Sequence, residues 1–403
     1  MSSKTYDIAI IGGGIVGCAT AMALSGTKKM SLAILEAEPN LSAHQTGNNS
    51  GVIHSGLYYK PGSMKALNCV EGRETLYQFC EKYGIAHDRC GKLVVATDQD
   101  QIPKLEELEK RGTANGLKDI KRLTAEELKE YEPHVGGVAG LLIHETGIVD
   151  YVQVTNKFAD IVRENGGEIH TNCRVFGFHR ENSGLVLETT QGTIHAKNLV
   201  NCAGLQSDRV AKLCGVDPGL KIIPFRGEYY KLVPEKEHLV KNLIYPVPDP
   251  QFPFLGVHFT RMIGGGVEAG PNAVLAYKRE GYKKTSFSIK DTADTFLYKG
   301  FWVLAGKFWK MGFGEMYRSF FKGAFVKALQ NLIPEVTGKD LHAGGAGVRA
   351  QALEPNGFLV DDFRIVEAPN MVHVLNAPSP AATASISIGE KIAEMVKKSF
   401  DLK

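Results

Sequence analysis

The stretch that decides the fold is Tyr6-Asp-Ile-Ala-Ile-Ile11, followed at once by Gly12-Gly-Gly14-Ile-Val-Gly17. The first six residues are apolar and rich in β-branched side chains, which predicts a strand buried in a parallel sheet. The small residues of Cys18–Leu24 predict a helix that opens at the glycines. A second apolar run, Leu32–Leu35, predicts the next strand, so the chain begins as a β-α-β unit.

The glycines have the spacing of a dinucleotide-binding turn. Gly12 permits the tight turn, Gly14 lets the backbone approach a pyrophosphate, and Gly17 lets the helix pack closely on the strand. The helix N-terminus offers amide donors and partial positive charge to phosphates. Glu36, at the end of the second strand, can accept hydrogen bonds from ribose hydroxyls. The alternative is a glycine turn without a ligand, but the complete β-α-β context favours a nucleotide site.

The rest of the chain predicts a fold of the α/β class (α+β overall) with two sheet-containing domains. Met371–Leu375 predicts a late strand and Ala381–Lys398 a helix, for which Ser379 would be the N-cap and Pro380 would occupy the first turn. The N-terminus of such a helix would stabilise negative charge that develops on a bound cofactor, as it does on a reduced flavin. Other helices are expected over residues 66–86, 101–130 and 152–165, and strands over 168–170, 175–181, 185–189, 193–196 and 198–204.

The domain organisation that follows is discontinuous. We expect a Rossmann-like nucleotide-binding domain built from residues 1–85, 145–220 and 340–403. A substrate domain with a mixed or antiparallel sheet would use residues 86–144 and 221–339. Its sheet is predicted over residues 222–278, with strands at Phe225–Val233, Phe254–Met262 and Gly265–Glu268.

Composition excludes several classes of protein. A formal net charge of +3 over 403 residues is too mild to indicate a nucleic-acid partner. Seven cysteines without a CxxC pair predict free thiols in a reducing compartment, and neither a disulfide framework nor a metal site is expected. The first strand begins so early that we expect no signal peptide, and no run of about 18 apolar residues appears. We therefore expect a cytoplasmic protein.

Several longer segments resemble a known family. They are His44–Tyr59, Gly256–Arg261, Val267–Asn272, Gly347–Gln351 and Asn376–Thr383. Together with the glycine turn, they resemble the D-amino-acid oxidase superfamily of flavoproteins. Within it, they resemble the L-2-hydroxyglutarate dehydrogenase/oxidase family over essentially the whole chain. One departure is Asn48, where the family pattern would have histidine.

The resemblance implies FAD as the cofactor and the oxidation of L-2-hydroxyglutarate to 2-oxoglutarate. Electrons would pass to a quinone, to another electron-transfer acceptor or to oxygen. Another FAD oxidoreductase of this fold, such as an amino-acid or amine oxidase or a glycerol-3-phosphate dehydrogenase, is the alternative, and a non-catalytic nucleotide-binding protein is a further one. The expected FAD contacts are Gly12, Gly14, Gly17, Glu36, Thr46, Gly47, Asn48, Asn49, Ser50, Val175, Ala203, Gly204, Pro380, Ala381 and Ala382.

Oxidation of a 2-hydroxy acid needs a base for the hydroxyl proton and cations for the carboxylates. His54 and His258 are the candidate bases, and an ordinary histidine pKa would place their ionisation between about pH 6 and 8. Arg349, in a glycine-rich segment, is the candidate carboxylate ligand. Arg226 and Arg261 are weaker candidates, since either could belong to a structural ion pair. The other expected substrate contacts are Tyr58, Tyr229, Thr260 and Ser379, although tyrosine often serves packing alone.

Residues 296–332 are unusually aromatic and basic. Between Phe296 and Lys327 lie 11 of the 35 aromatic residues and six basic residues against one acid, Glu315. Such a composition is typical of a segment lying at a membrane interface, and it is equally compatible with helices packed on the sheet domain. We therefore expect either packing or peripheral contact with the inner face of the cell membrane, where a quinone would be within reach.

Overall fold

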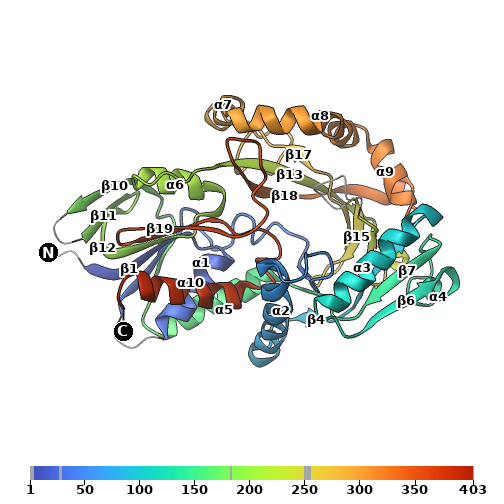
Figure 1. The fold of residues 1–403 in the computed structure, drawn as a ribbon, viewed down its shortest axis with the longest axis horizontal. Helices are drawn as coiled ribbons and strands as arrows, with labels where there is room; N and C mark the ends of the chain where they lie inside the picture. Colours follow the sequence, from blue (N-terminus) through green and yellow to red (C-terminus); the bar gives the residue numbers. More distant parts are fainter. Residues whose placement is uncertain (1–3, 27–29, 182–183, 249–255, 403) are drawn as a thin grey trace.

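The computed structural model describes residues 4–26, 30–181, 184–248 and 256–402. Two large sheets dominate it, one of eight strands and one of nine, and a small sheet joins β3 (Val52–Ile53), β8 (Gly147–Val149) and β4 (His87–Asp88). Figure 1 shows the eight-stranded sheet and its helices at one end of the molecule and the nine-stranded sheet at the other. This arrangement confirms the α/β class with a discontinuous nucleotide-binding half.

The eight-stranded sheet is assembled from three distant parts of the chain. Its central strand, β1 (Thr5–Ile11), lies between β12 (Gly192–Asn201) and β2 (Leu32–Leu35), and all three run parallel. The neighbours of these strands are also parallel: β9 (Glu168–His170) pairs with β2, and β20 (Met371–Asn376) pairs with β12. Antiparallel strands complete the sheet, namely β10 (Val175–Glu181), β11 (Gly184–Thr189) and β19 (Arg364–Ala368).

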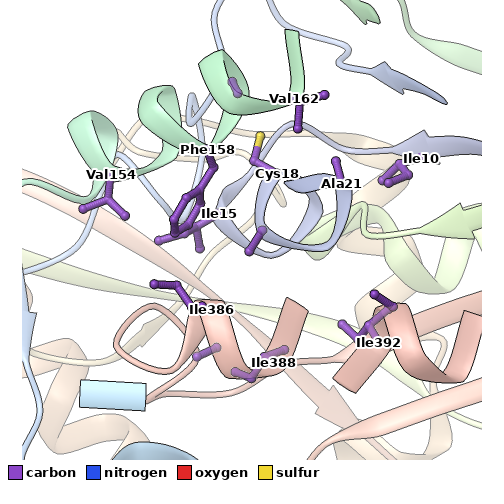
Figure 2. Close-up of a cluster of buried hydrophobic side chains, with 14 of the residues drawn as sticks. Ile10, Ile15, Cys18, Ala21, Val154, Phe158, Val162, Ile386, Ile388 and Ile392 are labelled. Carbon is purple, nitrogen blue, oxygen red and sulfur yellow. The ribbon is translucent and has the colours of Figure 1, made fainter. Parts of the chain in front are cut away.

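Three helices bury one face of this sheet. The N-terminal helix α1 (Ile15–Ser25) lies between α5 (Tyr151–Glu164) and α10 (Ser385–Ser399), and their apolar side chains interdigitate (Figure 2). Gly389 permits the close approach of α10, since a Cβ there would lie 2.6 Å from the Ala19 carbonyl carbon. The helix α2 (Met64–Tyr83) packs against the same cluster, and α6 (Ser207–Leu213) contributes to a separate apolar cluster on the sheet. This rigid core fixes the glycine turn at its edge.

The nine-stranded sheet carries the second half of the site. Its strands run in the order β18-β13-β16-β15-β14-β5-β7-β6, with β17 (Val274–Leu275) pairing with β13 on the same edge as β16. Most neighbours are antiparallel, although β14 pairs with β5 in parallel. The bounds are β18 (Leu341–Leu353), β13 (Lys221–Leu232), β16 (Val267–Gly270), β15 (His258–Arg261), β14 (Leu243–Pro246), β5 (Lys92–Ala96), β7 (Ala139–Ile143) and β6 (Ile120–Thr124).

The predicted helix over residues 101–130 is wrong as a single element. Helix α3 ends at Ala114, and Ile120–Thr124 forms β6, which pairs with β7. Helix α4 (Ala125–Tyr131) then starts afresh, because the Thr124 hydroxyl accepts from the Glu127 amide and the Glu127 carboxylate accepts from the Thr124 amide. This capping box satisfies backbone donors at a new helix start. Gly116, with φ +85°, lies in the connection that ends α3 (Ile102–Ala114).

The start predicted for the last helix is also wrong. Helix α10 begins at Ser385, with Ala384 at its N-cap, and both Ser379 and Pro380 precede it in a turn. The reason lies in Thr383, whose hydroxyl accepts from the backbone amide of His54 and hydrogen-bonds with the Tyr151 hydroxyl. These bonds hold the turn against β3, so Ser379 does not act as the cap.

Two further boundaries differ from the sequence prediction. Strand β18, which the boundary at residue 340 placed with the nucleotide-binding domain, pairs with β13 in the other sheet. Strand β15 begins at His258, and the predicted start at Phe254 lies outside the described residues. Among the described strands, β18 pairs only with β13 and so forms an edge of the sheet, and its Ala350 amide donates to Gln45 of the nucleotide-binding half.

Helices α7 (Ile289–Phe296), α8 (Lys299–Phe320) and α9 (Lys322–Gln330) cover the outer side of β13, β17 and β18, as Figure 1 shows. Phe308 has non-helical torsion angles and marks a kink inside α8. Among the helices of the described residues, none combines the length and apolar character needed to cross a membrane.

Candidate active site

A pocket opens at the carboxyl ends of β1 and β2, where ligands bind in open α/β sheets. Seven of its lining residues were predicted from the sequence to contact the cofactor: Gly12, Gly14, Glu36, Thr46, Val175, Ala203 and Gly204. Others were not predicted, among them Ser42, His44 and Glu280. The structure thus brings the glycine turn, the 42–46 segment and the end of β12 together around one space.

Glycine is needed at each position of the turn for a different physical reason. Gly12 has φ +111°, and a Cβ there would lie 2.4 Å from the carbonyl oxygen of Cys202. At Gly17 a Cβ would lie 2.0 Å from the Gly12 oxygen, so the internal packing excludes any side chain. At Gly14 the nearest atom would be Thr46 Oγ1, at 3.3 Å, although the residue lines the pocket. The space beside Gly14 therefore suits a pyrophosphate approaching the backbone.

Glu36 is fixed at the mouth of this pocket. Its Oε2 accepts from the Gly13 amide at 2.7 Å and its Oε1 from the Glu38 amide at 2.8 Å. A carboxylate has about four lone-pair positions, so two remain for ribose hydroxyls. Thr46 lies across the pocket, and its hydroxyl accepts from the Ile15 amide at the start of α1. These contacts fit the adenosine and pyrophosphate parts of a dinucleotide.

Residues 42–50 form a tight turn between the two sheets. The Asn48 amide donates to the carbonyls of Ala43 and His44, and the Asn49 amide to those of Gln45 and Thr46. A Cβ at Gly47 would lie 2.4 Å from the Ser42 oxygen. The two asparagine side chains thus shape the turn itself, and the cofactor contacts expected for Gly47, Asn48, Asn49 and Ser50 stay predictions.

The turn also contacts strand β18. The Gln45 side-chain oxygen accepts from the Ala350 amide at 3.0 Å. A Cβ at Gly347 would lie 2.5 Å from the Asn48 carbonyl oxygen, so the glycine allows this close approach. Arg349 lies between these two contact points and its side chain is exposed. The predicted carboxylate ligand is thereby placed beside the predicted cofactor loop.

His258 lies on one face of the nine-stranded sheet, beside Tyr245. The two rings are stacked with centroids 3.9 Å apart. The Nδ1 atom of His258 bonds the Gly256 carbonyl at 2.9 Å, which leaves Nε2 of a neutral ring with its lone pair available. Burial lowers the pKa of His258 to about 4, and the charges of Lys92 and Arg349 add to this effect. His258 is therefore neutral, as a base must be, at physiological pH.

His54 belongs to the same cluster, although it follows β3 on the other side of the site. Burial lowers its pKa to about 3, and the charges of Lys92, His258 and Arg349 lower it further. The structure therefore brings together both predicted histidines and the predicted arginine. It adds Lys92, which the sequence analysis missed. A lysine at the start of a strand that is buried throughout, Lys92–Ala96, was the signal that could have revealed it.

The two weaker arginine candidates form ion pairs. Arg226 is buried and donates to the Glu228 carboxylate at 2.7 and 3.1 Å. Arg261 donates to the Asp88 carboxylate. Alternation along β13 and β15 points both arginines to the face opposite Tyr229 and His258. The ion-pair alternative therefore describes both residues, and their substrate contacts have no support from this geometry.

The remaining expected substrate contacts surround the histidines. Thr260 is buried two residues from His258, on the same face. The ring of Tyr58 faces the Lys92 ammonium, and Ser379 hydrogen-bonds with Tyr59, a further tyrosine that could donate to a substrate oxygen. Arg349 interacts electrostatically with both Tyr59 and Tyr229. The predicted flavin contacts Pro380, Ala381 and Ala382 lie in the turn that Thr383 ties to His54.

Comparison with solved structures identifies the fold. L-α-glycerophosphate oxidase from Mycoplasma pneumoniae, solved with FAD bound, is similar with a TM-score of 0.79 and 24% identity, covering 99% of this chain and 96% of that one. Glycine oxidase from Geobacillus kaustophilus is similar with a TM-score of 0.74 and 17% identity, covering 98% and 95%. The fold of this chain is thus the one that these two oxidases share.

The family follows from the sequence as a whole. The model of the family described as FAD dependent oxidoreductase matches residues 7–395, and the chain belongs to this family. FAD is accordingly its cofactor, as predicted. L-2-hydroxyglutarate dehydrogenase from Indibacter alkaliphilus is 53% identical over 98% of this chain and 100% of the relative. The mitochondrial L-2-hydroxyglutarate dehydrogenase of Homo sapiens is 46% identical over 100% and 90%.

Proposed function

We propose that the protein oxidises L-2-hydroxyglutarate to 2-oxoglutarate. The observation that carries the proposal is the cluster of two neutral histidines and two basic side chains beside the cofactor loop. A 2-hydroxy acid needs this combination, because its hydroxyl loses a proton while its carboxylate needs a cation. Relatives with 46 to 53% identity over nearly the whole chain are L-2-hydroxyglutarate dehydrogenases, which supports the same substrate.

Each residue has one task in this proposal. Bound FAD supplies the hydride acceptor for C2 of the substrate. Nε2 of His258 takes the hydroxyl proton, because Nδ1 is engaged with the Gly256 carbonyl and the ring is held against Tyr245. Arg349 binds the carboxylate next to C2 through its planar fork. His54, whose backbone amide is held by Thr383, lines the same space from the cofactor side.

Anaerobic bleaching of the bound flavin tests the proposal. L-2-hydroxyglutarate should bleach it, whereas D-2-hydroxyglutarate and glycerol 3-phosphate should not. L-Lactate, which lacks the distal carboxylate, should react more slowly by at least about tenfold, the effect of one lost charge-assisted hydrogen bond. Equal rates with L-lactate would show that the distal carboxylate is not recognised, and faster bleaching by an amino acid would favour an amino-acid oxidase.

We further propose that α7 and α8 contact an anionic membrane surface and that the electron acceptor is a membrane quinone. Trp302, Trp309, Phe313 and Phe320 are 55 to 71% exposed and recur at helical spacing along one face of α8. Exposed lysines accompany them, including Lys299, Lys307 and Lys310. An aromatic face with basic neighbours matches an interfacial helix, and large apolar patches are uncommon on free surfaces.

A further inference from the structure

Lys92, the first residue of β5, is a buried cation. Its side chain is 1% exposed, and its ammonium lies 4.4 Å from the centroid of the Tyr58 ring and 5.0 Å from that of Tyr245. Within the described part of the chain, no carboxylate pairs with this ammonium and no hydrogen bond joins it to a neighbour. Its surroundings are therefore two aromatic faces rather than an acid.

A lysine in this position is costly for the fold. Buried charges are normally paired, and the attraction of a ring face compensates only a part of the lost hydration. Burial lowers the pKa of Lys92 to about 7, so the side chain is divided between its charged and neutral forms near neutral pH. An anion brought by a ligand would supply the partner that the described residues do not.

The sheet places Lys92 on the face that carries His258. Lys92 and Val94 share a face of β5, and Val94 is level with Tyr245 of β14. The pairing of Leu243 with Thr260 and of Ile244 with Phe259 brings Tyr245 level with His258. The stacked rings of Tyr245 and His258 and the ammonium above Tyr245 agree with this register. Lys92, Tyr245 and His258 thus lie on one face of three neighbouring strands, with Lys92 two residues along β5 from the level of Tyr245.

Arg349 lies across the sheet from Lys92, on the other side of His258. In the strand order β18-β13-β16-β15-β14-β5, the strand of His258 stands between that of Arg349 and that of Lys92. Tyr229 on β13 interacts with Arg349 and with Tyr245, which joins the two ends. The charges of Lys92 and Arg349 both lower the pKa of His258 and that of His54. Two positive groups therefore approach the histidines from opposite sides.

We propose that Lys92 binds the second carboxylate of a dicarboxylate substrate, with Arg349 on the carboxylate next to C2. This inference rests on the proposed function for the position of C2 at His258. A five-carbon 2-hydroxy diacid carries its two charges at opposite ends, which matches two cations on opposite sides of the base. Lys92 is then the residue that makes the site selective for diacids over monoacids.

The test compares two unreactive ligands of equal chain length, glutarate and pentanoate, on the FAD-bound protein. Their dissociation constants follow from the perturbation of the flavin spectrum, without turnover. Lys92→Met should weaken glutarate binding by at least about tenfold, the scale of a hydrogen bond to a charged group, and change pentanoate binding by less than about twofold. Lys121→Met, on the exposed part of β6, is the matched control and should change neither.

The outcomes separate this inference from the proposed function. Equal weakening of both ligands, or an unchanged affinity for glutarate, would overturn the role of Lys92. If Lys92→Met lost its FAD, Lys92→Gln and Lys92→Arg would replace it; only the arginine variant should keep the preference for glutarate. If glutarate binding depended on Lys92 but the wild type did not oxidise L-2-hydroxyglutarate, the proposed function would be wrong. The diacid site at Lys92 would still be supported.

Discussion

At the scale of single residues, the glycines of the turn have two different roles. Two are required by the packing of the chain, and one leaves space for a ligand. Gly12 and Gly17 are required by the chain itself, because an added Cβ would overlap backbone atoms. Gly14 meets only a side-chain oxygen at 3.3 Å and faces the pocket. A change at Gly14 should therefore affect the cofactor more than the fold.

Replacement of Gly14 by valine should yield folded protein with less than about a tenth of the wild-type FAD, since a loss of about 1.4 kcal/mol in binding suffices for tenfold. The branched side chain would fill the space where the pyrophosphate meets the backbone. Flavin absorbance per protein and circular dichroism measure the two quantities. Gly26→Val, at the other end of α1 where no atom lies within 4 Å of an added Cβ, is the control. Normal flavin content in Gly14→Val would refute the assignment.

The dependence of kcat/KM on pH should differ from that of an ordinary histidine base. Burial lowers the pKa of His258 to about 4 and that of His54 to about 3, so both remain neutral and able to accept a proton down to about pH 4. The sequence-based window of pH 6 to 8 for this ionisation is therefore too high. Burial also lowers the pKa of Lys92 to about 7, so its charge is lost as the pH rises through that value.

We accordingly expect kcat/KM for L-2-hydroxyglutarate to be constant between about pH 5 and 7 and to decrease above about pH 7. Initial rates across pH 4 to 10 measure this profile, in which kcat/KM reports groups of the free enzyme. The groups around Lys92 are Tyr58, Tyr245, Cys69 and the two histidines, and burial raises the pKa of each tyrosine and of the thiol, so none of them titrates near pH 7. Lys92→Met should lose the alkaline decline; its persistence would assign the decline elsewhere.

At the scale of elements, α8 combines two roles. Leu304 and Gly300 face inward, where Gly300 allows contact with the Glu354 carbonyl, while the aromatic face points outward. The alternative from the sequence, helices packed on the sheet domain, is thus correct for the inner face of the segment. It leaves the outer face without a partner among the described residues.

Vesicles of anionic lipid should bind the protein through this outer face. Each basic residue near such a surface contributes about 1 kcal/mol, and the attraction should weaken as salt rises. Co-sedimentation at low and high salt measures the binding. Trp302→Ala/Trp309→Ala should reduce it by about tenfold or more, whereas Phe176→Ala, an exposed aromatic on β10, should not. If the wild-type protein remained in the supernatant at low salt, the membrane contact would be refuted and α8 would serve only to pack on the sheet domain.

At the scale of the whole molecule, local pattern predicted the nucleotide-binding half well. The strand-turn-helix at residues 6–24 needs only its own apolar run and glycines, and β1 and α1 lie where these place them. The misplaced start of α10 has a different origin. Ser379 and Pro380 have the local signature of a helix start, and a bond from the distant His54 amide to Thr383 overrides it.

The residues of the site were predictable only where the sequence of a single segment indicated a function. His54, His258 and Arg349 stand in segments that resemble the flavoprotein family, and the structure brings them together. The only local signal for Lys92 was its place at the start of an apolar strand, and Tyr245 had none. Their proximity results from the parallel pairing of β14 with β5, which joins residues far apart in the chain. Arg226 and Arg261 were ambiguous for the same reason, since Glu228 and Asp88 decide their roles.

The pairing of β20 with β12, described above as sheet topology, also has a consequence for biosynthesis. The first strand emerges from the ribosome long before its neighbour β12, and α1 emerges long before α10, which covers it. A nascent chain therefore leaves the side of α1 that packs against α10 uncovered until residues 385–399 have been made. A message cut short before the codons for residues 371–399 would yield a chain whose first sheet lacks both β20 and the helix that covers α1, however intact its glycine motif.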